Sequence, residues 1–146
     1  MKPYSFRLNK ILDYRTYLRK RAQIDVFNAR NECQKREKEV LRLTEQRTGI
    51  SKERSEEEIK GISVPVYQIF RGFMQKIDCD LEEAHSKLNE GKEEVMMKEA
   101  ILKQASIKKK TLETLKDLQY KKYLENLGRE EQKTLDEIVI TGKGRS

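Results

Sequence analysis

Proline and tryptophan are scarce in this sequence, which has two prolines, no tryptophan and seven glycines among its 146 residues. Charged residues make up 39% of the chain and hydrophobic residues only 36%. A periodic chain that is rich in charge and poor in proline is typical of long helices and not of a compact globular domain.

Long apolar runs are also missing. No stretch of this sequence approaches the roughly 20 apolar residues that a membrane-spanning helix needs. The first residues lack the basic region and apolar core of a signal peptide. We therefore expect the protein to be made and kept in the cytoplasm.

Chemically reactive groups are few. His85 is the only histidine, and Cys33 and Cys79 do not form a C-x-x-C pair, so metal sites and nucleophile–base pairs have little support. The sequence also has no G-x-x-x-x-G-K-[ST] phosphate loop and no G-x-G-x-x-G motif. We predict that the protein is not an enzyme and holds no cofactor or metal, and that the cysteines pack without forming a disulfide.

Apolar residues recur at helical spacing from Val66 to Ile138, which predicts one long amphipathic helix. The core positions alternate in steps of three and four, as in a left-handed coiled coil, and three of them hold Gly91, Lys98 and Lys109. The predicted core residues are Phe73, Ile77, Leu81, Ala84, Leu88, Val95, Leu102, Ala105 and Leu112. A further apolar set continues with shifts of register through Leu115, Leu118, Tyr120, Leu124, Leu127, Leu135 and Ile138.

The first part of the chain supplies a partner helix. Ser5 can cap its start, a local stutter is expected between Ala22 and Val26, and three arginines fall in or beside core positions, namely Arg15, Arg36 and Arg47. The apolar positions are Phe6, Leu8, Ile11, Leu12, Leu18, Ala22, Val26, Ala29, Cys33, Val40, Leu43 and Ile50.

Residues 61–65 form the strongest break in the pattern. Gly61 suits a left-handed C-terminal cap, Ser63 an N-cap and Pro65 the first turn of a new helix. Two long helices joined by so short a loop must fold back on each other. The predicted fold is all-α, an antiparallel two-helix coiled-coil hairpin with long unequal arms. Its single domain has a helix at about 5–60, a turn at 61–65, a helix at about 66–140 and a disordered tail at 141–146.

The second arm is predicted to overhang the first. At 1.5 Å per residue the arms are roughly 80 Å and roughly 110 Å long, so the chain from about Leu118 onward has no partner inside the hairpin. Leu124, Leu127, Leu135 and Ile138 form an uncovered stripe there. Such a stripe is either a binding surface or part of a frayed tail.

Positive charge gathers at the open end of the predicted hairpin. The net charge is +7 and the pI about 9.3, which favours acidic partners, and pairing across the turn places residues 7–21 beside roughly residues 104–118. The basic residues there are Arg7, Lys10, Arg15, Arg19, Lys20, Arg21, Lys103, Lys108, Lys109, Lys110 and Lys116, against Asp13, Glu113 and Asp117. Because facing like charges cost stability, this arrangement indicates either an anionic partner or a generally basic solvated surface.

The turn end carries an apolar cluster of its own: Tyr67, Phe70, Phe73, Met74 and Ile77. A narrow seam can bury Phe70, Phe73 and Ile77, which would leave Tyr67 and Met74 at the edge. Aromatic residues and methionine are enriched at contact surfaces, so the cluster serves either a partner or core packing.

Three stretches together resemble the FliJ family of the bacterial flagellar type III export apparatus. They are FRLNKILDYR at residues 6–15, YQIF at residues 67–70 just after the turn, and EQKTLDE at residues 131–137. They occur in the family's order and spacing, and the likeness covers nearly the whole chain. Lys20-Arg21-Ala22 departs from the pattern, since an acidic residue is expected there.

The resemblance implies a stalk like that of a rotary ATPase, which docks in the export ATPase (FliI) hexamer, promotes its assembly and activity, and serves export chaperones. It also implies contacts with the export gate protein FlhA and the ATPase regulator FliH, at the cytoplasmic face of the inner membrane. The implied gate-contact residues are Val40, Leu43, Arg47, Ile50, Tyr67, Phe70, Met74 and Ile77. The implied ATPase-contact residues are Leu8, Leu12, Arg15, Arg19, Lys108, Lys109, Lys110, Leu124, Leu127, Gln132, Lys133, Asp136 and Glu137.

Two other functions fit the same pattern. One is the equivalent stalk of a virulence type III secretion system, and the other is a basic coiled coil that binds nucleic acid. Against nucleic acid, lysine outnumbers arginine in the basic patch and no aromatic residues are interleaved with it for base stacking, so no nucleic acid is expected. A membrane-surface helix is disfavoured because the apolar stripe is narrow and the arms are long.

Overall fold

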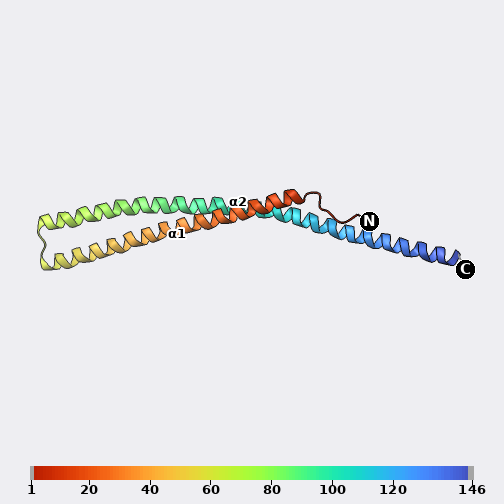
Figure 1. The fold of residues 1–146 in the computed structure, drawn as a ribbon. Helices are drawn as coiled ribbons and strands as arrows, with labels where there is room; N and C mark the ends of the chain where they lie inside the picture. The colour runs from red at the N-terminus through yellow and green to blue at the C-terminus, as the bar shows by residue number, and fades with distance from the viewer. Residues whose placement is uncertain (1, 145–146) are drawn as a thin grey trace. The chain divides into compact units, whose positions relative to one another are not determined.

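A computed structural model describes residues 2–144, which form two α-helices, α1 (Asn9–Lys60) and α2 (Val64–Gly144). The two helices pack against each other in antiparallel directions (Figure 1), which confirms the predicted all-α helical hairpin. No helix within the described residues is long and apolar enough to cross a membrane.

The chain divides into two units, each an antiparallel pair of α1 and α2 segments. The turn unit comprises Ala22–Leu102 and the open unit comprises Met1–Arg21 with Lys103–Ser146. Each unit is described below by itself.

The connection between the helices has the predicted turn chemistry. Gly61 has a φ of 91°, a left-handed conformation that is strained for residues with a Cβ atom. Ser63 occupies the N-cap position of α2, because its carbonyl accepts a hydrogen bond from the Tyr67 N–H at 3.0 Å. Pro65 lies in the first turn, where its missing N–H leaves no intrahelical bond unmade.

Both outer helix ends differ from expectation. The proposed cap at Ser5 is wrong, because α1 begins at Asn9 and the Leu8 carbonyl accepts its first hydrogen bond, from Leu12 N at 2.9 Å. At the other end α2 continues to Gly144, beyond the expected end near residue 140. The last residues of the predicted disordered tail, 145 and 146, lie outside the described residues.

The seam of the turn unit contains eight buried apolar side chains: Ala22, Val26, Cys33 and Leu43 on α1, and Met74, Ile77, Ala84 and Leu88 on α2. On α1 the least exposed residues step from 22 through 26, 29, 33, 36 and 40 to 43 in strict alternation of four and three. The stutter expected between Ala22 and Val26 is therefore wrong. We denote these seam positions a and d, with Leu12, Val26 and Met74 at a.

One core assignment near the turn is also wrong. Phe73 is 55% exposed and Met74 is only 9% exposed, the reverse of the prediction. Continuing the alternation backwards from Ala84 gives 81, 77, 74 and 70, so a regular seam selects Met74 and excludes Phe73. The larger aromatic side chain therefore lies on the surface because of its register position.

Polar contacts cross the seam of the turn unit. Arg30 pairs with Glu99 at 2.7 Å and Arg47 with Asp78 at 2.6 Å, although ion pairs this exposed stabilise a fold by little. Cys33 is buried, Cys79 is exposed, and both are free thiols.

The guanidinium group of Arg36 lies across the second helix. Its Nη1 donates to the Lys87 carbonyl at 2.7 Å, and a Cβ atom on buried Gly91 would lie 3.2 Å from the Arg36 Cδ. The absence of a side chain at residue 91 therefore makes room for an arginine in a core position.

The open unit has the predicted pairing. Lys116 Nζ donates to Asn9 Oδ1 at 3.2 Å and Arg19 Nε donates to Ser106 Oγ at 3.3 Å, which places residues 7–21 beside 104–118 as expected. Phe6 and Leu12 are its buried apolar side chains among the described residues. The skipped core positions Lys98, in the turn unit, and Lys109, here, are both half-buried.

An N-terminal strap, residues 2–8, extends the paired region of the open unit. The Tyr4 hydroxyl donates to the Lys116 carbonyl at 3.2 Å, and the Tyr123 hydroxyl donates to the Lys2 carbonyl at 3.1 Å. The Tyr4 ring lies 5.1 Å from the Tyr120 ring and 5.5 Å from the Tyr123 ring, centroid to centroid. The uncovered overhang therefore begins near Leu124 and not at Leu118 as expected.

Candidate functional site

Charge separates the two units. Lysines and arginines number 18 in the open unit against 8 aspartates and glutamates, whereas the turn unit has 14 against 17. The positive net charge of the whole chain therefore resides in the open unit, where it favours an anionic partner surface.

Residues predicted to contact an ATPase fall into two groups in the open unit. Leu12 is buried and Leu8, Arg15 and Arg19 are half-buried, so these four hold the helices together. The second group is accessible, because Lys108 and Lys110 are exposed. Lys109 lies in the seam, where its Nζ is 3.4 Å from a carboxylate oxygen of Glu113.

The overhang presents the rest of that predicted set. Leu124 is exposed, Leu127 is half-buried, and Lys133 and Glu137 are exposed. Gln132 Nε2 donates to Asp136 Oδ1 at 3.2 Å along the same helix. Sequence reasoning missed Val139 and Ile140, which are exposed beside Leu135 and Ile138, although their apolar character was a visible signal.

Residues predicted to contact the export gate are mostly buried or half-buried within the turn unit. Leu43, Met74 and Ile77 are buried, and Val40, Ile50 and Phe70 are half-buried. The structure thus brings the two predicted segments together across the seam. Most of their side chains pack against each other and are not accessible to a partner. Of the set, only Tyr67 and the ion-paired Arg47 are exposed.

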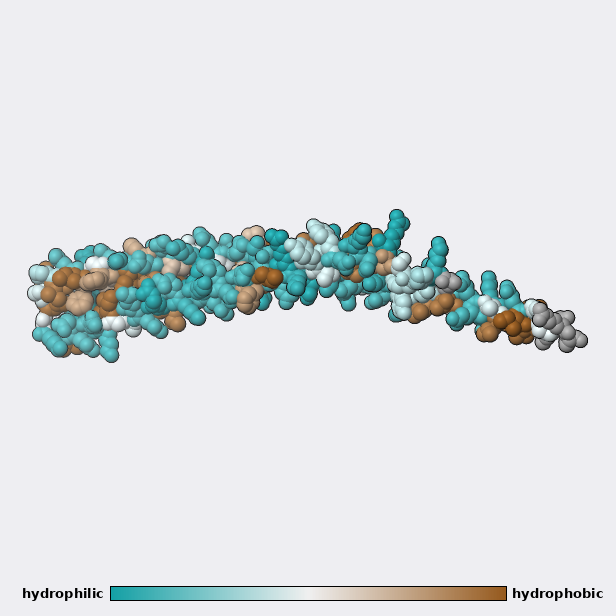
Figure 2. Space-filling model, viewed as in Figure 1, coloured by the Kyte–Doolittle hydropathy of each residue, from teal (hydrophilic) through white to brown (hydrophobic). Residues whose placement is uncertain are grey.

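A different apolar surface surrounds the turn. Figure 2 shows hydrophobic atoms gathered at this end of the molecule. The exposed apolar residues are Ile59, Val64, Val66, Tyr67, Ile69 and Phe73. Sequence reasoning missed Ile59, Val64 and Ile69 and assigned Phe73 to the core. Strict alternation of four and three backwards from Ala84 would have placed Phe73 outside the seam. We name these six residues the turn patch.

One surface ion pair of the turn unit shifts the pKa values of both its members. Hydrogen bonds from the Arg42 guanidinium, at 2.7 and 3.1 Å, hold the pKa of the Glu39 carboxyl below its usual range. The same pairing raises the pKa of Arg42. Both side chains are open to solvent, as in an ordinary surface ion pair.

No cluster of three or more histidine, cysteine, aspartate or glutamate side chains that could hold a metal ion occurs in residues 2–144. His85 lies exposed on α2.

One argument against nucleic acid is wrong. Tyr14 and Tyr17 lie within the basic segment 7–21, and both are 56% exposed. The Arg15 guanidinium carbon lies 5.9 Å from the centroid of the Tyr14 ring. Aromatic side chains are thus interleaved with the positive charge, and the expectation of no nucleic-acid partner stays a prediction.

Comparison with known protein families supports the resemblance found in the sequence. The family described as Flagellar FliJ protein matches residues 4–145. No curated protein and no solved structure matches the chain. The family is a coiled-coil, non-catalytic component of flagellar protein export, and the match spans nearly the whole chain. This chain therefore belongs to the flagellar FliJ protein family.

Proposed function

We propose that the chain is a non-enzymatic stalk of the flagellar export apparatus that docks in the export ATPase (FliI) ring through its open unit. Docking would promote assembly of the ATPase hexamer and its activity. The observation that carries this proposal is the charge of the paired segments 1–21 and 103–117, where 12 lysines and arginines face only 3 acids. Facing like charges are unfavourable in isolation, so an anionic ring interior would relieve their repulsion.

The turn patch is proposed to contact the export gate protein FlhA. Its six exposed apolar side chains suit a protein contact, and they belong to the turn unit, whereas the basic segments belong to the open unit. FliH and the export chaperones are further proposed partners. Through these contacts the protein would work at the cytoplasmic face of the inner membrane.

Hydrolysis of ATP by the cognate FliI, with and without this protein, tests the stalk proposal. We expect faster hydrolysis together with a shift of the ATPase to a hexamer on a sizing column. An ATPase that is competent alone, yet shows neither change when the protein is added, would overturn the proposal.

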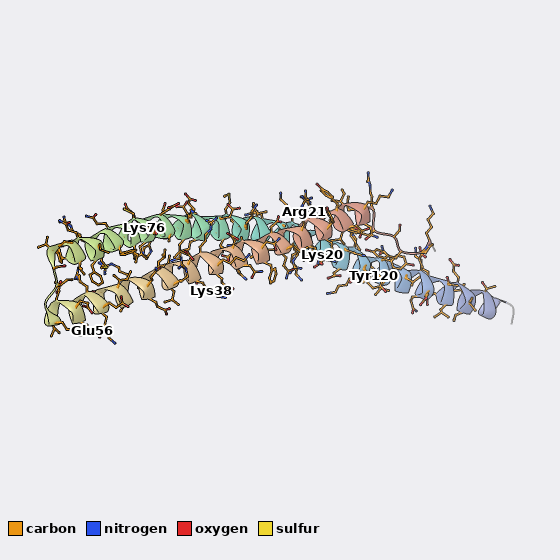
Figure 3. All side chains as sticks on the ribbon, turned by 60° about the vertical axis from the view of Figure 1, so that its left-hand side comes forward. Lys20, Arg21, Lys38, Glu56, Lys76 and Tyr120 are labelled. Carbon is orange, nitrogen blue, oxygen red and sulfur yellow. The ribbon has the colours of Figure 1, made fainter. Side chains whose placement is uncertain are left out.

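Charge reversal then locates the docking surface. Replacing the exposed residues Lys103, Lys108 and Lys110 with Glu should abolish the stimulation while the helical content by circular dichroism stays the same. The matched control is Lys35→Glu with Lys38→Glu and Lys76→Glu, an equal change of charge on exposed lysines of the turn unit; Lys38 and Lys76 are labelled in Figure 3. Equal loss in both triple variants would mean that net charge and not the open unit drives docking.

Aromatic truncation tests the gate contact. Tyr67→Ala with Phe73→Ala should weaken capture of FlhA and leave ATPase stimulation unchanged. Met96→Ala with Met97→Ala is the control, because these exposed apolar residues lie on the same helix away from the turn. Full retention of FlhA by the Tyr67 and Phe73 variant would exclude the turn patch as the contact.

A further inference from the structure

The first residues of the strap are held on α2 mainly by one tyrosine. Among residues 2–5 only Tyr4 is not fully exposed, and its ring packs against the rings of Tyr120 and Tyr123 at 5.1 and 5.5 Å between centroids. In the described chain, residues 2–5 share two hydrogen bonds with α2, each between a tyrosine hydroxyl and a backbone carbonyl, at 3.2 and 3.1 Å. Each such contact stabilises a fold by little, so release of the strap costs little.

The tyrosines beneath the strap begin an apolar stripe that continues along the overhang. Its residues are Tyr120, Tyr123, Leu124, Leu127, Leu135 and Ile138. The first four follow one another at i, i+3, i+4 and i+7, and the last two lie at i+15 and i+18, so that all six fall on one face of the helix. We name these six residues the α2 stripe. The strap covers its first turn and no more.

The α2 stripe beyond the strap is open to solvent. Leu124, Leu135 and Ile138 are 46%, 57% and 61% exposed. A hollow of about 470 Å³ lies along the same face, and its lining residues are Leu127, Glu130, Glu131, Thr134 and Leu135. This part of the stripe is therefore ready to receive the apolar face of a partner helix.

The strap and a docked helix compete for the first turn of the stripe. A helix that packs along Leu124 and Leu127 continues, one turn or 5.4 Å further towards the seam, onto Tyr120 and Tyr123. The Tyr4 ring occupies that place; Tyr120 is labelled in Figure 3. Packed helices lie 8–10 Å apart between their axes, which leaves no room for the strap between them. The strap therefore limits a partner helix to the stripe from Leu124 onward.

We propose that the strap is an autoinhibitory cover, which lies on Tyr120 and Tyr123 in the free chain and is displaced by a helix of the export ATPase when the open unit docks. This inference rests on the proposed docking in the FliI ring and adds a regulatory step to it. The apparent affinity of a chain is its intrinsic affinity multiplied by the fraction of molecules in the binding-competent state. A strap that covers the stripe most of the time therefore weakens docking without taking part in it.

Removal of the strap tests the cover. The variants are a chain without residues 2–5, which keeps the buried Phe6, and Tyr4→Ala in the full chain; Ser5→Ala, at an exposed strap position, is the matched control. The measured quantity is the concentration of chain that gives half-maximal stimulation of ATP hydrolysis by the cognate FliI. We expect it to fall about fivefold or more without the strap, to fall for Tyr4→Ala, and to stay within about twofold for Ser5→Ala.

Fastening the strap gives the opposite test within a single protein. Tyr4→Cys with Tyr123→Cys, in a chain that also carries Cys33→Ala and Cys79→Ala, is joined by a short bifunctional thiol reagent. The same protein capped with a monofunctional thiol reagent is the control, because its sequence and helical content are identical. We expect the joined protein to need about fivefold or more of the concentration that the capped protein needs. Saturating FliI, added before the bifunctional reagent, should lower the yield of the joined product.

Several results would overturn the proposal. Weaker docking without residues 2–5 would make the strap part of the docking surface, and equal docking of the joined and capped proteins would mean that the strap obstructs nothing. A strapless chain that forms a dimer and stimulates no better would assign the α2 stripe to a second copy. Stimulation by the unaltered chain separates the two proposals: if it occurs and the strap variants match it, only the cover is wrong, and if no form of the chain stimulates, the stalk proposal fails as well.

Discussion

The turn unit and the open unit are both antiparallel helix pairs, but their seams differ. Eight of the ten buried apolar side chains in the described residues belong to the turn unit, and the open unit buries only Phe6 and Leu12. The seam of α2 in the open unit instead holds half-buried Ala105, Lys109 and Leu112. A lysine in a seam position weakens apolar packing and specifies register.

Charge follows the same division. The open unit combines a thin core with an excess of positive charge, and the strap and its tyrosines supply contacts that the seam lacks. The turn unit has a denser core and nearly balanced charge. The difference indicates that folding stability is concentrated in the turn unit, while the open unit keeps apolar and basic surface available for partners.

The largest expected effect concerns core packing. Ile77→Ala in the turn unit should lower the free energy of unfolding by about 2–3 kcal/mol, because a buried aliphatic side chain is removed from a packed seam. Leu115→Ala in the open unit should lower it by less than about 1 kcal/mol, since that side chain is 37% exposed. Urea unfolding followed by circular dichroism measures both, and equal losses would contradict the comparison.

Removing the strap contact should have a local effect of about 1–2 kcal/mol. Tyr4→Ala deletes an aromatic cluster and a hydrogen bond, so amide exchange should accelerate around residues 116–123 and stay unchanged in the turn unit. Tyr17→Ala, on the outer face of α1, is the control. It should change amide exchange neither around residues 116–123 nor in the turn unit. Acceleration that extends through residues 74–88 would show that the strap supports both units.

Substitution of two glycines by alanine compares a seam position, Gly91, with a position in the overhang, Gly128. Gly128 has open space around its missing Cβ. Gly128→Ala should therefore raise the free energy of local helix opening by about 0.5–1 kcal/mol, because alanine has the higher helix propensity. Slower amide exchange around residue 128 would measure this gain. Gly91→Ala should gain less, because its methyl group would lie 3.2 Å from Arg36 Cδ. An equal gain at both sites would mean that Arg36 shifts freely.

The smallest effect is a pH dependence. Because Arg42 holds the pKa of Glu39 below its unfolded value near 4.5, the pair stabilises the turn unit above that pH. This contribution is lost as the pH falls through the lowered pKa of folded Glu39. Urea unfolding at pH 7 and pH 3 should show it, and Glu39→Gln should reduce the difference; an unchanged difference would show that other groups dominate.

Local signals explain why much of the hairpin was predictable. The alternation of three and four, Gly61, Ser63 and Pro65, and the basic open end are all patterns of neighbouring residues. They were sufficient for the fold, the turn and the pairing of residues 7–21 with 104–118. The register predicted near the turn is wrong at Phe73, because the steps from Phe73 to Ile77 and from Ile77 to Leu81 are both four and break the alternation, which Met74 keeps.

The sequence by itself determined two helices, their antiparallel pairing, the seam and the uneven charge, since each depends on spacing along the chain. Only the tertiary structure decided that the strap lies on Tyr120 and Tyr123 and that Arg36 crosses beside Gly91. These features depend on contacts between residues more than 50 positions apart. No local pattern contains them, because burial is a property of both facing helices together.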